Sequence, residues 1–107
     1  MIKIIIRRNA AGKTCGFDVF DHGDGIVCAA VSALALNAVN SVETLTDERF
    51  ICDEDEKKGF LSLRLPDIEK GEEANDARLL LDSFALGARW IAEGYPDDVR
   101  VKYETIN

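Results

Sequence analysis

Two residues in this chain have side chains and a spacing suited to covalent catalysis. His22 is the only histidine among the 107 residues, and it precedes Cys28 by six positions. A cysteine attacks as its thiolate, which is favoured at a helix N-terminus or beside an imidazole that takes the proton. We expect a strand that ends at Asp21, a glycine-rich turn and then a helix that begins near Cys28. His22 and Cys28 are therefore the candidate catalytic residues.

Two neighbouring residues are candidates for a supporting role. Ser32 follows Cys28 by four residues and so lies on the same face of the predicted helix, from which its hydroxyl could donate a hydrogen bond to a thiolate. Asp24 could either cap the helix or orient the imidazole, and the sequence does not choose between these roles. Backbone N–H groups of the turn could also bind the oxyanion of a tetrahedral intermediate.

Each of these residues also has an ordinary structural interpretation. A cysteine beside alanines is most often a small buried side chain, and a helical serine commonly bonds its own backbone. A histidine in a loop is most often solvated. Cys15 and Cys52 lie in predicted strands, where we expect both to be core residues. Residues 23–25 resemble the start of a dinucleotide-binding G-x-G-x-x-G, but Cys28 stands in place of its third glycine.

The composition limits the class of protein and its partners. A chain of 107 residues with 47% hydrophobic residues is typical of one folded domain, here residues 1–107. No apolar run approaches the ~18–20 residues that span a bilayer, and the first residues lack a signal-peptide layout. We therefore expect a cytoplasmic protein with no membrane partner. Three cysteines without C-x-x-C spacing and a single histidine predict no metal site, and we expect no cofactor.

The charge balance indicates which macromolecules the chain would bind. The net charge of −7 would repel phosphate backbones, so we expect no direct contact with nucleic acid. A basic polypeptide would be attracted instead.

Hydrophobic periodicity predicts elements in the order β-β-α-β-β-α-β. The expected strands are residues 2–7, 14–20, 49–52, 60–65 and 98–106, and the expected helices are residues 26–45 and 72–94. The first two strands form a hairpin, and so do the next two. Their connection, residues 53–59, contains four acidic residues and is interpreted as a solvated turn, with docking of a partner as the alternative. Pro66 and residues 67–71 interrupt the pattern before the second helix.

This order is typical of a two-layer α/β fold (α+β), in which two helices pack on one face of a mixed sheet. The helix of residues 26–45 is apolar nearly all round, because Ala29, Ala33 and Leu36 lie outside its main apolar face. A helix of that kind is buried on more than one side. In so small a domain, a second copy of the chain would supply the extra cover. The sequence therefore predicts a homodimer.

Two neighbouring blocks resemble a known family. Residues 17–22 (FDVFDH) and residues 26–34 (IVCAAVSAL) are similar to the ribosomal-processing cysteine protease family, Prp. The resemblance implies a homodimeric α/β protein that cleaves a peptide with a cysteine–histidine pair. By position, it makes His22 the general base and Cys28 the nucleophile, and Ser32 matches a serine of the same helix motif. It implies as substrate the N-terminal extension of a large-subunit ribosomal protein precursor.

The chain departs from the family pattern around the histidine. Asp21 and Gly23 stand where the family usually has glycine and alanine, and Gly25 occupies a position where aspartate is common. The segment between histidine and cysteine is also shorter than is usual in the family.

Two hypotheses of different classes follow. The first is a cytoplasmic cysteine endopeptidase that removes the extension of a ribosomal protein precursor, with Cys28 as nucleophile and His22 as general base. The alternative is a non-catalytic dimeric factor that binds or assembles ribosomal components through the same cleft.

Overall fold

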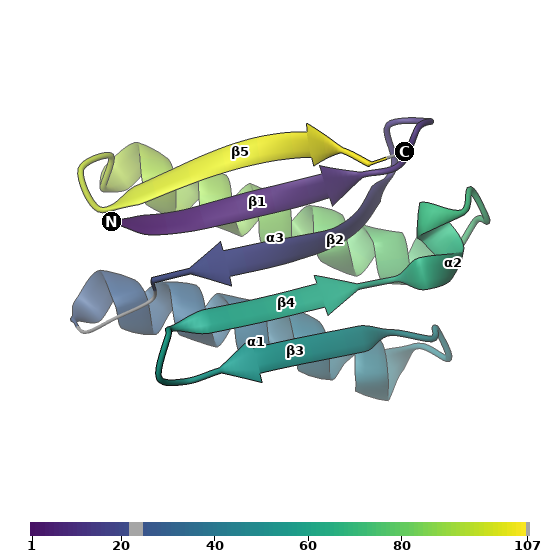
Figure 1. Cartoon of the computed structure of the whole chain (residues 1–107), viewed down its shortest axis with the longest axis horizontal. Helices are drawn as coiled ribbons and strands as arrows, with labels where there is room; N and C mark the ends of the chain where they lie inside the picture. The colour runs from purple at the N-terminus through teal and green to yellow at the C-terminus, as the bar shows by residue number, and fades with distance from the viewer. Residues whose placement is uncertain (22–24, 107) are drawn as a thin grey trace.

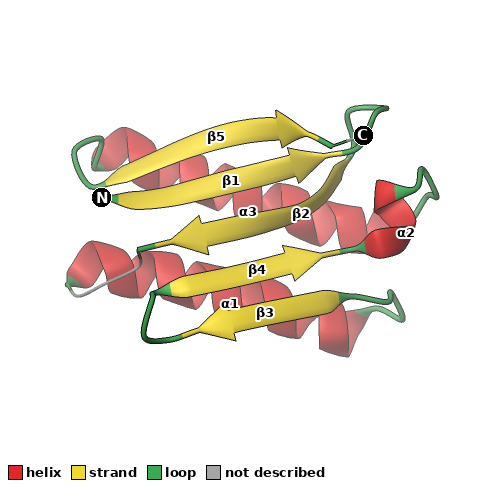
Figure 2. Cartoon of the chain, viewed as in Figure 1, coloured by secondary structure: helices red, strands yellow, loops and turns green. Residues whose placement is uncertain are grey.

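The computed structural model describes residues 1–21 and 25–106, which form one mixed sheet and three helices (Figure 1). The elements in chain order are β1 (Ile2–Arg8), β2 (Thr14–Phe20), α1 (Ile26–Leu45), β3 (Ile51–Asp55), β4 (Phe60–Arg64), α2 (Pro66–Glu69), α3 (Asn75–Gly94) and β5 (Val99–Thr105). The strand order is β3-β4-β2-β1-β5. Both long helices lie behind the sheet in Figure 2. The predicted two-layer fold is therefore confirmed.

The pairing of β1 gathers three separate parts of the chain at one end of the sheet. β1 pairs with β2 antiparallel, with Lys3 opposite Phe20, so β2 ends beside the start of β1. β1 pairs with β5 in parallel, with Ile2 opposite Val99, so β5 also begins there. α1 begins at this same end of the molecule (Figure 1). Residues near positions 1, 21, 28 and 98 are thereby brought close together.

Alternation along the strands supplies one half of the core. Ile2, Ile4 and Ile6 of β1 are buried on the face that the helices cover, as the period of two requires. In β2, Phe17 stacks on Phe84 of α3, with ring centroids 4.0 Å apart. This aromatic contact fixes α3 against the middle of the sheet.

α1 and α3 pack against each other behind the sheet. A Cβ added at Gly87 of α3 would lie 2.9 Å from a methyl carbon of Leu34 in α1, so a larger residue there would require the Leu34 side chain to shift. The buried residues of α1 are Cys28, Val31, Ala35, Ala38, Val39 and Val42. They share one face of the helix, which anchors the helix and therefore the position of its first turn.

One expectation about α1 needs correction. The helix is 20 residues long with a mean hydropathy of 1.6, which matches a membrane span by length and composition alone. From the sequence we expected no apolar run that approaches the ~18–20 residues of a membrane span. In the structure the buried face of α1 packs on the sheet and on α3, as in the core helix of a folded domain.

The opposite face of the sheet carries a polar network. Asp18 of β2 is buried, and its carboxylate accepts hydrogen bonds from the Arg7 guanidinium and, at 2.7 Å, from the Ser62 hydroxyl. The pKa of Arg7 is raised, mainly by the hydrogen bond to Asp18. Because both lone-pair-bearing oxygens are partnered, this buried carboxylate stabilises the register of three adjacent strands.

β1, β4 and β5 differ from the prediction by one residue at one or both ends, and three other elements differ by more. β3 was expected at residues 49–52 but lies at Ile51–Asp55, because charged side chains are tolerated on an edge strand whose residues are mostly exposed. Residues 67–71 were treated as a break, yet Pro66 begins the short helix α2, where a missing N–H costs nothing. α3 begins three residues later than predicted, at Asn75.

Candidate functional site

Cys28 lies in the first turn of α1. The helix begins at Ile26, and its first intrahelical hydrogen bond runs from the Ala29 N–H to the Gly25 carbonyl at 3.0 Å. The N–H groups of residues 26–28 therefore precede this ladder and have no hydrogen-bond partner among residues 1–21 and 25–106. Gly25 has φ of +105°, a conformation that side chains disfavour, so glycine is needed where the chain enters the helix. Within the described residues, no side chain caps this end.

The sulfur of Cys28 lies between the core and a cavity. The residue is 6% exposed and belongs to the buried cluster, yet it also lines a cavity of about 410 Å³. Its Sγ lies 3.8 Å from the Ser32 Oγ, and either atom could be the donor. The structure therefore brings Cys28 and Ser32 together, as their spacing predicted.

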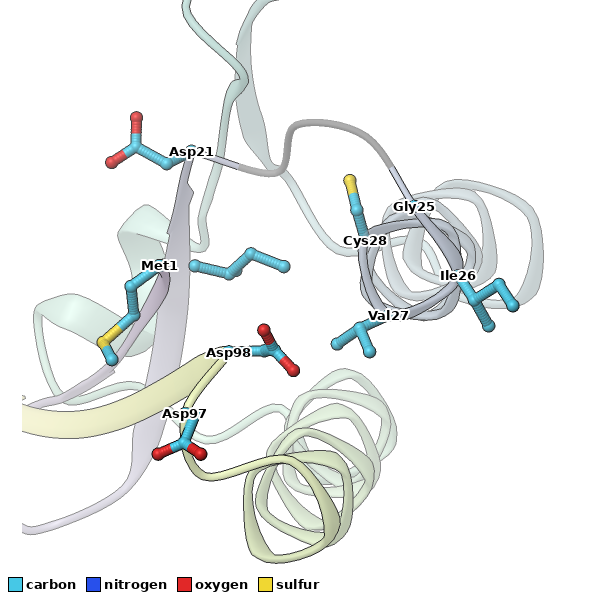
Figure 3. A pocket seen from close by; sticks show the side chains of 9 residues that line it. Met1, Asp21, Gly25, Ile26, Val27, Cys28, Asp97 and Asp98 are labelled. Atoms are coloured by element: carbon cyan, nitrogen blue, oxygen red, sulfur yellow. The ribbon is translucent and has the colours of Figure 1, made fainter.

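The cavity occupies the end of the sheet where the chain segments converge (Figure 3). It lies between the first turn of α1, the end of β2, the start of β1 and the turn that precedes β5. The lining residues are Met1, Ile2, Asp21, Gly25, Ile26, Val27, Cys28, Asp97 and Asp98. A cavity of this volume is within the range that holds a small ligand or a short peptide segment.

Sequence reasoning missed the acidic residues of this cavity. Asp97 and Asp98 are far from Cys28 in sequence and reach the cavity because β5 pairs in parallel with β1. The signal that could have found them is their place just before the last strand. Had that strand been paired with the first, Asp98 would have been placed beside Ile2, whose N–H donates to its carbonyl at 2.8 Å.

Two predicted site residues, His22 and Asp24, lie outside the described residues. The neighbours on either side, Asp21 and Gly25, both line the cavity. Asp21 has φ of +60°, in the left-handed region, so the chain turns sharply as it leaves β2.

The other two cysteines have different surroundings. Cys15 is buried as predicted, and burial raises the pKa of its thiol to about 11. Cys52 was expected in the core but is exposed, because β3 is an edge strand. All three thiols are free. Within residues 1–21 and 25–106, no three His, Cys, Asp or Glu side chains are grouped to hold a metal ion.

Comparison with known proteins gives a consistent result. A family model described as cysteine protease Prp matches residues 1–100. The ribosomal processing cysteine protease Prp of Staphylococcus aureus (strain Mu50) is 30% identical over 110 residues, covering 97% of this chain and 100% of the relative.

Two solved structures have the same fold. A ribosomal processing protease Prp from S. aureus in complex with a substrate peptide is 27% identical with a TM-score of 0.86. The same protease with a covalently linked product peptide is 29% identical with a TM-score of 0.87. Each comparison covers 97% of this chain and 100% of the other.

Proposed function

Because the chain belongs to the family of Prp cysteine proteases, we propose that it is an endopeptidase in which Cys28 is the nucleophile and His22 the general base. The observation that carries this proposal is the position of Cys28 in the first turn of a long helix, at the edge of a cavity. The assignment of His22 depends on the sequence block FDVFDH and the family resemblance, since His22 lies outside the described residues.

The chemistry follows from these two side chains. His22 takes the proton of the Cys28 thiol, and the sulfur attacks the scissile carbonyl to form a tetrahedral oxyanion. The N–H groups at the start of α1 are donors suited to that oxyanion. His22 then returns the proton to the leaving amine, which leaves an acyl-enzyme. A water molecule, deprotonated by His22, releases the acid and restores the thiol.

We take the substrate class from the relatives. The S. aureus relative is called a ribosomal processing protease, and its structures hold a substrate peptide and a covalently linked product peptide. The substrate proposed for this chain is the N-terminal extension of a large-subunit ribosomal protein precursor. Such proteins are basic, which suits a chain with net charge −7.

The proposed active unit is a cytoplasmic homodimer. The helix layer leaves large apolar side chains exposed on its outer side, among them Leu36 of α1 and Leu86 and Trp90 of α3. A second copy of the chain would cover them. Trp90→Lys should shift the mass measured by sedimentation from dimer to monomer, whereas Lys3→Glu on the opposite face of the sheet should not. A wild-type chain that sediments as a monomer would contradict the proposal.

Cleavage of a ribosomal precursor tests the function directly. The purified protein is incubated with the precursor from its own organism, and products are identified by mass spectrometry. We expect one cut with wild type, and at least about a 10³-fold lower rate with Cys28→Ala and with His22→Ala. Cys52→Ala is the matched control, since Cys52 is an exposed thiol on the edge strand β3 and does not line the cavity.

The same variants separate the proposal from the non-catalytic alternative. If Cys28→Ala is folded by circular dichroism but supports growth as well as wild type does, the chain acts as a binding or assembly factor instead. Absence of any cleavage by folded wild type would contradict the protease assignment.

A further inference from the structure

The cavity beside Cys28 has an unbalanced charge. The residues that line it include three aspartates, Asp21, Asp97 and Asp98. Among the described residues that line it, the only cationic group is the amino terminus of Met1, and there is no lysine or arginine side chain. Charges of one sign in a concave site focus the electrostatic potential and raise the local concentration of the opposite charge.

Asp98 is the carboxylate that points into this cavity. In Figure 3 its oxygens are directed from the start of β5 across the cavity toward Val27, in the turn of α1 that carries Cys28. The side chains of Asp21 and Asp97 point away from that space. Asp98 is therefore placed to contact a bound group, and the other two add to the field around it.

The backbone of Asp98 is fixed, although its carboxylate is unpaired within the described chain. Its carbonyl accepts the Ile2 N–H at 2.8 Å, and its own N–H donates to the Tyr95 carbonyl at 3.0 Å. No hydrogen bond or ion pair of the Asp98 side chain occurs among residues 1–21 and 25–106. The exposed carboxylate, on a backbone fixed by these two bonds, is available to a cation brought by the substrate.

From this geometry we propose that Asp98 is a specificity-determining residue, which selects peptides with a lysine or arginine close to the scissile bond. Asp21 and Asp97 strengthen the selection through their field. Because Asp98 and Cys28 line the same cavity, the cation must lie within a few residues of the scissile bond. The proposal rests on the proposed function and adds its substrate preference.

A first experiment measures the potential at Cys28 without requiring proteolysis. In a Cys52→Ser background, Cys28 is modified with two methanethiosulfonates, one with a trimethylammonium group and one with a sulfonate. In each reaction the thiolate attacks the sulfenyl sulfur and releases methanesulfinate, leaving a mixed disulfide. The ratio of the two rates, measured by mass spectrometry, reports the local potential.

We expect the cationic reagent to modify Cys28 of wild type at least about 10-fold faster than the anionic one. The ratio of the two rates should fall about 3-fold in Asp98→Asn, and it should also fall when wild type is measured at high salt. Asp53→Asn is the matched control, because Asp53 lies on β3 at the opposite edge of the sheet from β5. The proposal would be overturned if wild type reacted at equal rates with the two reagents, or with neither of them. It would also be overturned if the rate ratio fell equally in Asp98→Asn and in Asp53→Asn.

A second experiment applies the proposal to peptides. Precursor peptides are compared with versions whose lysines and arginines near the cut are replaced by alanine. Asp98→Asn should raise KM about 5-fold for the basic peptides and leave kcat and the alanine peptides unchanged. An equal loss on both kinds of peptide would overturn the charge selection while leaving the protease assignment intact. Failure of wild type to cut any peptide would instead contradict the proposed function.

Discussion

Cys28 and Cys15 are both buried, but they occupy contrasting regions of the molecule. Cys15 lies within β2 in the middle of the sheet, 1% exposed, where its Sγ is 3.6 Å from the Arg7 carbonyl. Cys28 is 6% exposed and lies in the first turn of α1, beside a cavity. Their exposed fractions are nearly equal, and yet only one thiol borders a space into which a reactant could enter.

If Cys28 is the nucleophile, as proposed, burial alone does not separate a structural thiol from a reactive one. In the sheet interior, desolvation by burial raises the pKa of the Cys15 thiol to about 11, and it outweighs the opposing hydrogen bond from the residue's own backbone. The start of a helix has N–H groups without intrahelical partners, which are directed at the region where a thiolate or an oxyanion would form. We therefore expect the position of a cysteine in its helix or strand, rather than its burial, to decide whether its thiol reacts.

The sharpest test of the contrast is the rate of alkylation of each thiol in the folded protein. With a pKa of about 11, Cys15 is only about 0.1% thiolate at pH 8, and its packing also blocks access. We expect iodoacetamide to modify Cys28 at least about 100-fold faster than Cys15 at pH 8. The modification of Cys15 should increase as the pH rises toward 11, because a raised pKa moves thiolate formation to higher pH.

Peptide mapping by mass spectrometry assigns each rate to its cysteine. The unfolded protein in denaturant is the control, in which all three thiols should react alike. If Cys28 were modified as slowly as Cys15, the expected difference in reactivity between the two thiols would be wrong.

Replacing each cysteine by alanine should have a smaller effect, on the free energy of unfolding. Here Cys15, the less reactive thiol, should matter more than Cys28. Cys15→Ala removes a sulfur from a closely packed interior and should lower the free energy of unfolding by about 1–2 kcal/mol. Cys28→Ala should lower it by less than about 1 kcal/mol, because the sulfur already borders a cavity. Urea unfolding measures both, and an unchanged slope with denaturant confirms that the comparison is valid. A larger loss for Cys28→Ala would mean that its role is mainly in packing.

The residues that the sequence placed correctly are those whose signals are local. The bounds of α1 were predicted at Ile26 and Leu45, because Gly25 precedes a continuous helical pattern. The pairing of Cys28 with Ser32 also follows from one turn of helix, and the observed 3.8 Å agrees with it. Local spacing was sufficient for this half of the candidate site.

What the sequence could not supply depends on contacts between distant segments. Asp98 reaches the cavity only through the parallel pairing of β5 with β1, which no local pattern reveals. Cys52 was assigned to the core because its strand was not recognised as an edge, and strand order is also a long-range property. The short helix that begins at Pro66 spans too few residues to show a period.

The smallest predicted effect concerns Ser32. It tests how much of the difference in reactivity between Cys28 and Cys15 depends on a side chain rather than on the start of the helix. At 3.8 Å the Ser32 hydroxyl is at the long end of a sulfur hydrogen bond, so it contributes little to the neutral thiol. It should contribute more to a thiolate, because hydrogen bonds to charged groups are stronger. Ser32→Ala should therefore lower both the alkylation rate of Cys28 and kcat/KM by about 2- to 5-fold, with stability nearly unchanged.

Ser32→Thr keeps the hydroxyl and should recover most of that loss, while Ser41→Ala, on the same helix but more than two turns away, is the matched control. If Ser32→Ala and Ser41→Ala behave alike, the hydroxyl has no part in the reactivity of Cys28. The difference between the two buried cysteines would then depend on the backbone donors at the start of α1, on the adjoining cavity and on the proposed general base His22.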